Sequence, residues 1–391
     1  MSHQTPTTNS ACTSATATER EIRQQPAIWR AVHADIQSQR QAIDDFLCSI
    51  LTQAGVRVVF TGAGTSAFAG DMLASLLGMQ LDARVDAVAT TDIVARPTEC
   101  LAPDSPLLLV SIARSGNSPE SVAATRMAEQ CSAGCYHLIL TCNPEGELHR
   151  IHAGTDRALL LTMPSGSNDQ GFAMTSSLSS IVWAALCVFM PNQADAERTE
   201  QIARAADNLL ATDAKQVQTT FCGDYDRVVY LGSGVFRGLA QEAALKILEL
   251  TAGEVVALHD TPLGFRHGPK SLVNDKTLLV TFVSNDAYAR RYDEDIVAEL
   301  TGQNGHERVV AVAASGWDTL DGATLWPCDE LAEAPDWMLV FPYLITAQLA
   351  ALYTSLAHGK TVDNPFPDGD VNRVVQGVTI HPFAAGSGDS E

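Results

Sequence analysis

Basic residues are scarce in this sequence. Its 391 residues include 25 lysines and arginines against 46 aspartates and glutamates, which gives a formal net charge of −21 at pH 7. A chain with this charge repels nucleic acids and anionic lipid surfaces, so we expect neither as a partner. An anionic ligand would have to be held locally, by backbone N–H groups, hydroxyls and helix N-termini.

Paired cysteines and long apolar runs are also missing. The nine cysteines are an odd number without a C-x2-C motif, and Cys131 and Cys135 form a C-x3-C pair that no second pair of ligands follows. This usage is typical of free thiols in a reducing compartment and predicts no metal site. The polar N-terminus has no apolar segment of a secretory signal, and the longest apolar patch, residues 181–190, is too short to span a bilayer. We therefore expect a cytoplasmic protein that does not enter a membrane.

Length and hydrophobic content indicate two α/β domains. The chain is 46% hydrophobic, enough for real cores, and too long for a single ordinary one. We expect an N-terminal arm and helix over residues 1–45, a first domain over 46–212 and a second over 213–391. Each domain is predicted to be a doubly wound, mostly parallel sheet flanked by helices. Two hexapeptides, TGAGTS (61–66) and LGSGVF (231–236), share a Gly-x-Gly, and each lies at the end of a short strand rich in β-branched residues. Their similarity indicates an internal duplication.

Two smaller features are predicted near the ends of the chain. Pro26 interrupts a helical region and is expected to begin a new helix, because proline suits the first turn. The Asn/Pro/Asp-rich tail is expected to be a loop with a short strand at residues 378–380.

Two hydroxyl-rich turns follow neighbouring strands of the predicted first sheet. They come after the strands at residues 56–60 and 106–112, whose carboxyl ends would meet where ligands of open α/β sheets bind. Free N–H groups at the following helix starts suit a phosphate, although such hydroxyls often serve only as helix caps. The predicted binding residues are Gly64, Thr65, Ser66, Arg114, Ser115, Asn117 and Ser118, with Thr175 and Ser176 either lining the same pocket or merely starting the next helix. The second domain lacks the Ser-x-x-Ser turn, so we expect one phosphate pocket per chain.

A polar stripe marks a predicted helix of the second domain. Glu242, Lys246 and Glu249 are spaced i, i+4 and i+7, which places them on one face. After an irregular segment comes His267, followed by Gly268 and a proline. A carboxylate stripe with a loop histidine could form an acid/base pair. The alternative is an exposed Glu–Lys pair, worth about 0.3–0.5 kcal/mol, with an ordinary loop histidine.

In combination, these motifs resemble the sugar isomerase (SIS) family, duplicated in tandem. Residues 115–118 are similar to its Ser-Gly-Glu-Thr phosphate turn and residues 63–66 to its Gly-Thr-Ser turn. The stripe of residues 242–249 and the His-Gly-Pro of 267–269 resemble the isomerase half of glucosamine-6-phosphate synthase. Residues 171–177 and the tail at 364–365 and 372–380 are most similar to the AgaS type, the galactosamine-6-phosphate deaminase/isomerases, which are also known as tagatose-6-phosphate ketose/aldose isomerases.

The resemblance implies conversion of D-galactosamine 6-phosphate to D-tagatose 6-phosphate and ammonia by a 1,2-proton shift, without metal or organic cofactor. It implies that Glu249 moves the proton, Lys246 orients Glu249 and Glu242 holds Lys246. His267 would open the sugar ring and would come from the neighbouring subunit of a homodimer. Gln376 stands where the synthase has a lysine that can form a Schiff base, so a covalent imine at this position is not expected.

Other functions remain open at this point. Plain aldose/ketose isomerisation and glucosamine-6-phosphate deamination use the same proton shift. A non-catalytic sugar-phosphate sensor belongs to another class, as does a dinucleotide oxidoreductase built on Gly62-x-Gly64 with Asp86 as the ribose partner, although the third glycine of that fingerprint is missing.

Overall fold

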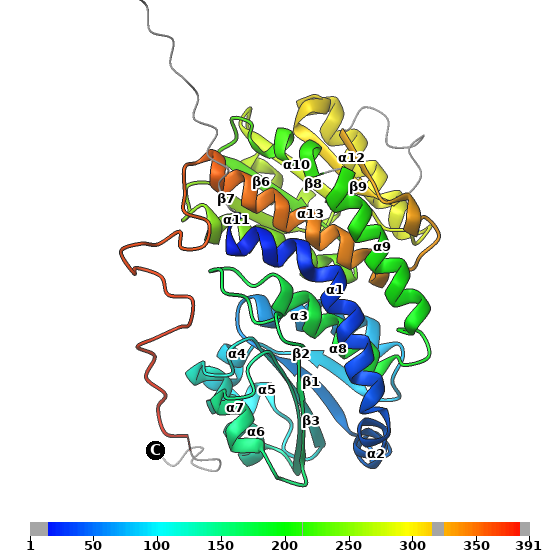
Figure 1. Cartoon of the computed structure of the whole chain (residues 1–391), viewed down its shortest axis with the longest axis vertical. Coiled ribbons are helices and arrows are strands. Elements are labelled where there is room, and N and C mark those ends of the chain that lie inside the picture. The colour runs from blue at the N-terminus through cyan, green and yellow to red at the C-terminus, as the bar shows by residue number, and fades with distance from the viewer. Residues whose placement is uncertain (1–14, 213, 315–323, 384–391) are drawn as a thin grey trace, which may run out of the picture.

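The computed structural model describes residues 15–212, 214–314 and 324–383, so the first 14 residues of the predicted arm lie outside it. Figure 1 shows two α/β halves, one above the other, with a layer of helices between their sheets. Each sheet has five strands, and all the strand pairs are parallel. The predicted α/β class with parallel sheets is confirmed.

The first half forms a sheet in the order β2-β1-β3-β4-β5. Its strands are β1 (Arg57–Thr61), β2 (Arg84–Ala87), β3 (Pro106–Ala113), β4 (Gly134–Thr141) and β5 (Ala158–Thr162). The helices up to the end of this half are α1 (Ala17–Ser38), α2 (Arg40–Leu51), α3 (Thr65–Gly78), α4 (Thr90–Ala95), α5 (Pro97–Cys100), α6 (Pro119–Cys131), α7 (Glu147–His152) and α8 (Ser176–Phe189).

The second half repeats this topology in the order β10-β9-β8-β6-β7. Its strands are β6 (Arg227–Leu231), β7 (Val256–Asp260), β8 (Thr277–Phe282), β9 (Val309–Ala313) and β10 (Thr324–Pro327). The helices α9 (Ala196–Thr212) and α10 (Ala214–Phe221) lead into it, followed by α11 (Val235–Leu250), the 3-10 turns η1 (Gly264–Arg266) and η2 (Pro269–Leu272), α12 (Ala289–Asn304), the 3-10 turns η3 (His306–Arg308) and η5 (Asp329–Leu331), and α13 (Asp336–Ala357).

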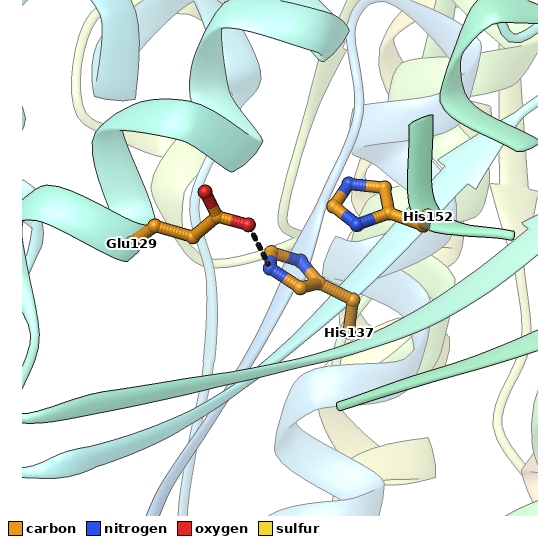
Figure 2. A group of neighbouring side chains, drawn as sticks. All are labelled: Glu129, His137 and His152. Atoms are coloured by element: carbon orange, nitrogen blue, oxygen red, sulfur yellow. Dashed lines mark hydrogen bonds and ion pairs between the residues drawn. The ribbon is translucent and has the colours of Figure 1, made fainter. Parts of the chain in front are cut away.

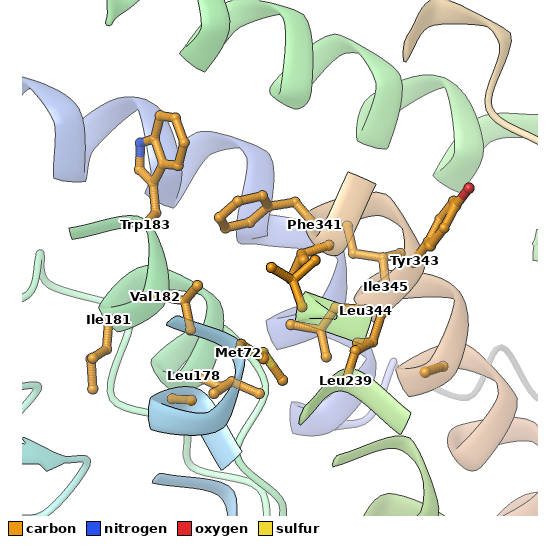
Figure 3. Packing of buried hydrophobic residues seen from close by; sticks show 14 of the residues in the cluster. Met72, Leu178, Ile181, Val182, Trp183, Leu239, Phe341, Tyr343, Leu344 and Ile345 are labelled. Carbon is orange, nitrogen blue, oxygen red and sulfur yellow. The ribbon is translucent and has the colours of Figure 1, made fainter. Parts of the chain in front are cut away.

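Alternating side chains of the strands form separate cores on the two faces of each sheet. Val58 and Phe60 of β1 join the large core between the sheets, whereas Val59 packs on the other face, toward α6. In the second half, Val228 and Tyr230 join the same central core. This is the period of two that strands impose on their side chains. Figure 3 shows the central core, where Met72, Trp183, Leu239 and Phe341 from four helices pack together.

The expectation for Pro26 is wrong. This residue lies inside α1, and the helix continues to Ser38 before α2 begins at Arg40. Proline cannot donate the hydrogen bond that the Ile22 carbonyl would normally receive. The side-chain amide of Gln25 donates to that carbonyl instead, over 2.9 Å, so the helix passes the proline without a break.

Strand predictions failed in four places. β2, β7 and β10 were not predicted, and β7 falls in the segment expected to be irregular. All three are edge strands, and the side chains of β2 and β7 are partly exposed, so these two lack the apolar run that marks a buried strand. Conversely, residues 378–380 form no strand.

The tail joins the two halves without regular structure. It leaves α13 in the second half and runs down one side of the molecule to the first half (Figure 1). On the way, the Asp363 carboxylate accepts 2.8 Å hydrogen bonds from the N–H groups of Ala17 and Thr18 and so caps α1. Ile380 and Phe383 then pack against the outer core of the first sheet.

One helix of the described residues, α13, is long and apolar enough to cross a membrane. In this fold, 94% of its most apolar 18-residue stretch is buried, and the helix packs against α11, α10, α9 and α1. That is the position of a core helix, and it accounts for the apolar composition.

Candidate active site

The turn between β1 and α3 is shaped by two glycines. A Cβ on Gly62 would lie 2.5 Å from the Cβ of Ser66, so only glycine fits there. Gly64 has φ 55°, a backbone conformation that residues with a side chain rarely adopt, and it is the N-cap of the helix. Thr65 and Ser66 are therefore the first residues of α3, and both are buried at the carboxyl end of β1. Helix N-termini attract anions, and the predicted phosphate turn therefore opens a helix.

The polar stripe of α11 is buried and reaches this turn. Lys246 is 1% exposed and Glu242 is fully buried, which contradicts the alternative of an exposed Glu–Lys pair. The Lys246 Nζ donates a 3.0 Å hydrogen bond to the Thr65 hydroxyl and lies 3.4 Å from Glu242 Oε1. It also forms an ion pair with Glu249, whose side chain stays 26% exposed. Lys246 thus connects the carboxylates of the second half with the predicted phosphate turn of the first.

Close packing of two helices brings these groups together. A Cβ on Gly238 of α11 would lie 2.7 Å from the backbone nitrogen of Met72 in α3. A larger residue would force the helices apart. The close approach lets the buried Lys246 span from its own helix to the first residue of α3.

Burial and charge set the protonation of the stripe. Burial raises the pKa of Glu242 to about 7, although Lys246 opposes the rise. Burial acts to lower the pKa of Lys246, but the Glu242 and Glu249 carboxylates outweigh it and the pKa is raised. The ammonium is therefore charged at neutral pH. Glu249, the most accessible of the three, is held against this cation at the edge of the buried cluster.

The second predicted turn, between β3 and α6, is held by hydrogen bonds to the neighbouring β4–α7 turn. The backbone N–H of Asn117 donates to the Ser115 hydroxyl over 3.3 Å. The Asn117 side-chain oxygen accepts a 2.9 Å bond from the N–H of Glu147, and the Ser118 hydroxyl donates to that of Ser121 over 2.6 Å. The side-chain oxygen of Asn117 therefore binds the first residue of α7, whereas the Ser115 hydroxyl only accepts a hydrogen bond and can still donate its proton to a ligand. Ser121 belongs to this group but was not predicted.

Arg114 holds backbone segments in place. Its buried guanidinium donates to the carbonyls of Phe172, at 3.1 Å, and of Arg373 in the tail, at 2.8 Å. Burial and the nearby Arg373 lower the pKa of Arg114, whereas Asp169 and Glu249 act to raise it. Arg114 thus lies within electrostatic reach of Glu249, and it ties the tail to the carboxyl end of β3.

Thr175 and Ser176 are occupied by structural contacts. The carboxylate of Asp169 accepts 2.8 Å bonds from the N–H and the hydroxyl of Thr175 and a 2.9 Å bond from the N–H of Ser176. The Ser176 hydroxyl donates to the Glu21 carbonyl over 2.6 Å. Both residues are buried, and these contacts match the alternative in which they start a helix. Asp169 as their cap was missed, because it lies six residues before Thr175, whereas the acidic residue of a capping box follows the N-cap by three residues.

His267 and Gln376 lie apart from this cluster. His267 ends the 3-10 turn η1, is exposed, and its imidazole makes no hydrogen bond or ion pair with the described residues. The loop itself is anchored, since Arg266 and Lys270 both bind Glu299 of α12. Gln376 is exposed in the tail. Neither residue contacts the Lys246 cluster within one chain.

Two further hydroxyls near the carboxyl ends of the first-half strands were missed by the sequence analysis. Thr61, the last residue of β1, is the register partner of Ser111 in β3. Both hydroxyl oxygens are buried and have no hydrogen-bond partner among the described residues. The signal in the sequence was weak: single hydroxyl residues within otherwise apolar strands.

Comparisons with known proteins agree with this arrangement. The SIS domain family profile matches residues 50–190. The chain is 50% identical to an AgaS protein of Streptomyces coelicolor, over 94% of this chain and 96% of that one. It is 44% identical to the D-galactosamine-6-phosphate deaminase AgaS of Escherichia coli, over 97% and 99% of the two chains. Among solved structures, the tagatose-6-phosphate ketose/aldose isomerase of Escherichia coli superposes with a TM-score of 0.90 at 42% identity, covering 96% of this chain and 99% of that one. The chain therefore belongs to the AgaS family of SIS-domain proteins.

Proposed function

We propose that this protein is a D-galactosamine-6-phosphate deaminase that releases D-tagatose 6-phosphate and ammonia. The observation that carries the proposal is the contact between Lys246 and Thr65, which places a buried cation and the carboxylate of Glu249 beside the hydroxyl-rich start of α3. The AgaS proteins that share nearly the full length of this chain are named for this activity.

The phosphoryl group would bind at the first-half sheet edge. The start of α3 offers backbone N–H groups, and the β3–α6 turn offers the Ser115 hydroxyl. The charge of −21 leaves no basic surface for an anion, so these local donors would carry the binding. In this arrangement the domain of residues 46–212 holds the phosphate, and the domain of residues 213–391 supplies the acid/base groups.

The chemistry would take place at C1 and C2 of the open-chain amino sugar. Glu249 removes the proton from C2 while the C1 carbonyl oxygen gains a proton, which gives an enolamine. Glu249 then returns its proton to C1, and the C2 imine that results is hydrolysed by water to a ketone and ammonia. Lys246, held by the buried Glu242, keeps Glu249 in place and stabilises negative charge on oxygen. These steps require only groups of the chain and water.

Ammonia release is the direct test. The purified protein would be incubated with galactosamine 6-phosphate and, separately, with glucosamine 6-phosphate, and both ammonia and ketose phosphate would be measured. We expect ammonia and tagatose 6-phosphate from the first substrate, with a lower kcat/KM for the second. Interconversion of tagatose 6-phosphate and its aldose without ammonia would favour plain isomerisation, the activity in the name of the superposing structure. Binding of either sugar phosphate without turnover would identify a sensor and refute the proposal.

We further propose a cytoplasmic homodimer in which His267 of one subunit serves the Glu249 of the other. The support is that His267 is exposed and that its imidazole has no hydrogen-bond or ion-pair partner among the described residues of its own chain, while its loop is anchored to α12. Mixing two inactive variants, Glu249→Gln and His267→Asn, under conditions that exchange subunits should restore activity, because a mixed dimer contains one intact site. No recovery in a mixture that is shown to contain mixed dimers would mean that His267 serves the Glu249 of its own chain, and it would refute the shared site.

A further inference from the structure

A group of three metal-ligating side chains lies on the outer face of the first sheet. Glu129 comes from the last turn of α6, His137 from β4, and His152 ends α7. Their ligand atoms all lie within 4.8 Å of one another. Figure 2 shows the three side chains side by side, with a hydrogen bond between the carboxylate of Glu129 and the His137 imidazole.

The spacing of the polar atoms suits a small divalent ion. Glu129 Oε1 and His137 Nε2 are joined by a 3.1 Å hydrogen bond, whose proton a bound ion would replace. Two ligands bound at 2.0–2.1 Å to a tetrahedral zinc are separated by about 3.3 Å. The carboxylate and one imidazole therefore already lie near the separation of two ligands on one ion, and the two histidine ring centres are 4.1 Å apart.

Buried nitrogens without partners point to a ligand. His137 is 2% exposed and His152 is 5% exposed, yet His137 Nδ1 and His152 Nε2 have no hydrogen-bond partner among the described residues. Buried polar atoms in folded proteins nearly always have one. A ligand bound within this group would supply such a partner.

The group also has access to solvent. It lines a cavity of about 440 Å³ together with Ser132, Cys135 and Arg157. The side chain of Glu129 is 53% exposed, so an ion can enter from its side. With three protein ligands, a fourth position would remain for water from this cavity.

This site is separate from the catalytic cluster. His137 lies four residues before the carboxyl end of β4, which is roughly 13 Å along the strand. The opposite end of α7 holds the Ser115–Ser118 turn, through the bond from the Glu147 N–H to Asn117. A metal here would therefore not touch the substrate.

We propose that Glu129, His137 and His152 bind one divalent transition-metal ion of the zinc class. Two imidazoles and one carboxylate suit zinc and its neighbours rather than magnesium or calcium, which prefer oxygen ligands. The ion would link α6, β4 and α7 and stabilise the first half. The cysteine spacing predicted no metal, but the ligands here come from three elements that only the fold brings together.

Zinc titration of the full chain tests the site. The protein would be treated with EDTA, freed of the chelator, titrated with zinc chloride by calorimetry, and analysed for bound metal by mass spectrometry. We expect one zinc per chain in the wild type and an increase in Tm on addition of zinc. His152→Gln should lose this equivalent. Glu129→Gln, a change at a half-exposed side chain that leaves folding intact, should weaken Kd by at least the about 10–100-fold that loss of an outer-sphere partner causes.

His149→Gln is the matched control, because His149 lies on the same helix outside the group. It should bind zinc like the wild type. With cobalt in place of zinc, the wild type and the control should show the intense visible absorption of a four-coordinate site, and His152→Gln should not. The proposal fails if the wild type binds no zinc, or if His152→Gln and Glu129→Gln bind it as tightly as His149→Gln; the cluster would then be a packed pair of neutral histidines.

Discussion

The two halves of the molecule share a scaffold but differ in the chemistry they place on it. Gly64 and Gly234 start α3 and α11 with nearly the same backbone angles, φ 55° and 58°. At the same offset, Thr65 and Ser66 correspond to Val235 and Phe236. The first half has hydroxyls where the second has apolar side chains, so only the first-half helix start keeps polar side chains for an anion.

The charged stripe shows the reverse difference. Glu242, Lys246 and Glu249 of α11 correspond by position to Met72 and Leu76 of α3 and to Met79, which caps its C-terminus. The pseudo-equivalent of the active site is a cavity of about 550 Å³ lined by Leu76, Met79 and Gly234. Each half has thus kept one part of the site, and the close packing of α3 on α11 joins the two parts.

Carboxylates occupy the second-half turn that corresponds to the phosphate turn. Asp336 accepts a 2.6 Å bond from the Ser284 hydroxyl and a 2.7 Å bond from the N–H of Asn285, and Asp293 accepts a 2.9 Å bond from the N–H of Ser284. These donors already have anionic partners within the chain, so a phosphate would be repelled. This agrees with one sugar-phosphate site per chain.

Replacing the proposed proton carrier should have the largest effect. Glu249→Gln keeps the shape of the side chain but cannot accept a proton, so kcat should fall by about 10²–10⁴-fold with KM little changed. Met79→Gln, at the corresponding position in the first half, should leave both constants unchanged, since Met79 is 78% exposed. Steady-state kinetics of ammonia release would measure both. Full activity of Glu249→Gln would move the base to another residue.

The two strand-end serines should separate substrate binding from stability. Ser115→Ala removes a hydroxyl that we assign to the phosphate, and loss of a hydrogen bond to a charged group should raise KM about 10-fold. Ser284→Ala removes the hydroxyl bonded to Asp336 and should lower Tm but leave KM unchanged. If Ser284→Ala raised KM as much as Ser115→Ala, the second half would also take part in binding.

The sequence predicted the scaffold well because its signals are local. Buried central strands such as β3 and β6 appear as apolar runs, and the glycine turns repeat after β1 and β6. Edge strands lack that signal, and β7 was read as irregular. Pro26 was misjudged because its compensation comes from a Gln25 side chain that also contacts Gln348, far away in the chain.

The site was predicted as far as single motifs allow. The i, i+4, i+7 spacing placed Glu242, Lys246 and Glu249 on one helix face, but it could not tell an exposed stripe from a buried one. Burial follows from the packing of α11 on α3, which no local pattern encodes. Likewise, the sequence could not show that Arg114 binds backbone carbonyls, or that Asp169 holds Thr175.

The free energy of unfolding should depend on pH through the buried carboxyl of Glu242. The pKa of Glu242 in the folded chain, about 7, lies above its ordinary value of 4.5, so the folded state binds a proton more tightly than the unfolded state. Stability from this group is therefore present below pH 4.5 and is lost as pH rises to about 7. Glu242→Gln should remove this loss, which is about 3 kcal/mol. Thermal unfolding from pH 5 to 8 would show a flatter profile than the wild type.

Asp293 provides the comparison in the second half. Burial raises its pKa to about 7 as well, so Asp293→Asn should flatten the stability profile in the same direction. Only Glu242→Gln should also lower kcat, because Glu242, unlike Asp293, pairs with Lys246. Equal loss of activity in both variants would mean that the effect reflects general destabilisation rather than the Lys246 contact.

Substitution of Gly238 tests the packing of α11 on α3, which joins the two halves, and we expect it to have the smallest effect on activity. Gly238→Ala places a methyl group 2.7 Å from the Met72 backbone, so α11 must shift from α3 and stability should fall by about 1–2 kcal/mol. Gly302→Ala, in α12 with no atom within 4 Å of the new methyl, should instead gain about 0.5–1 kcal/mol from helix propensity. Calorimetric Tm values would report both changes. Because Lys246 reaches Thr65 across this packing, Gly238→Ala should also lower kcat, while Gly302→Ala should not. If Gly238→Ala lost stability but kept its full kcat, the site would tolerate looser packing of α11 on α3 than we expect.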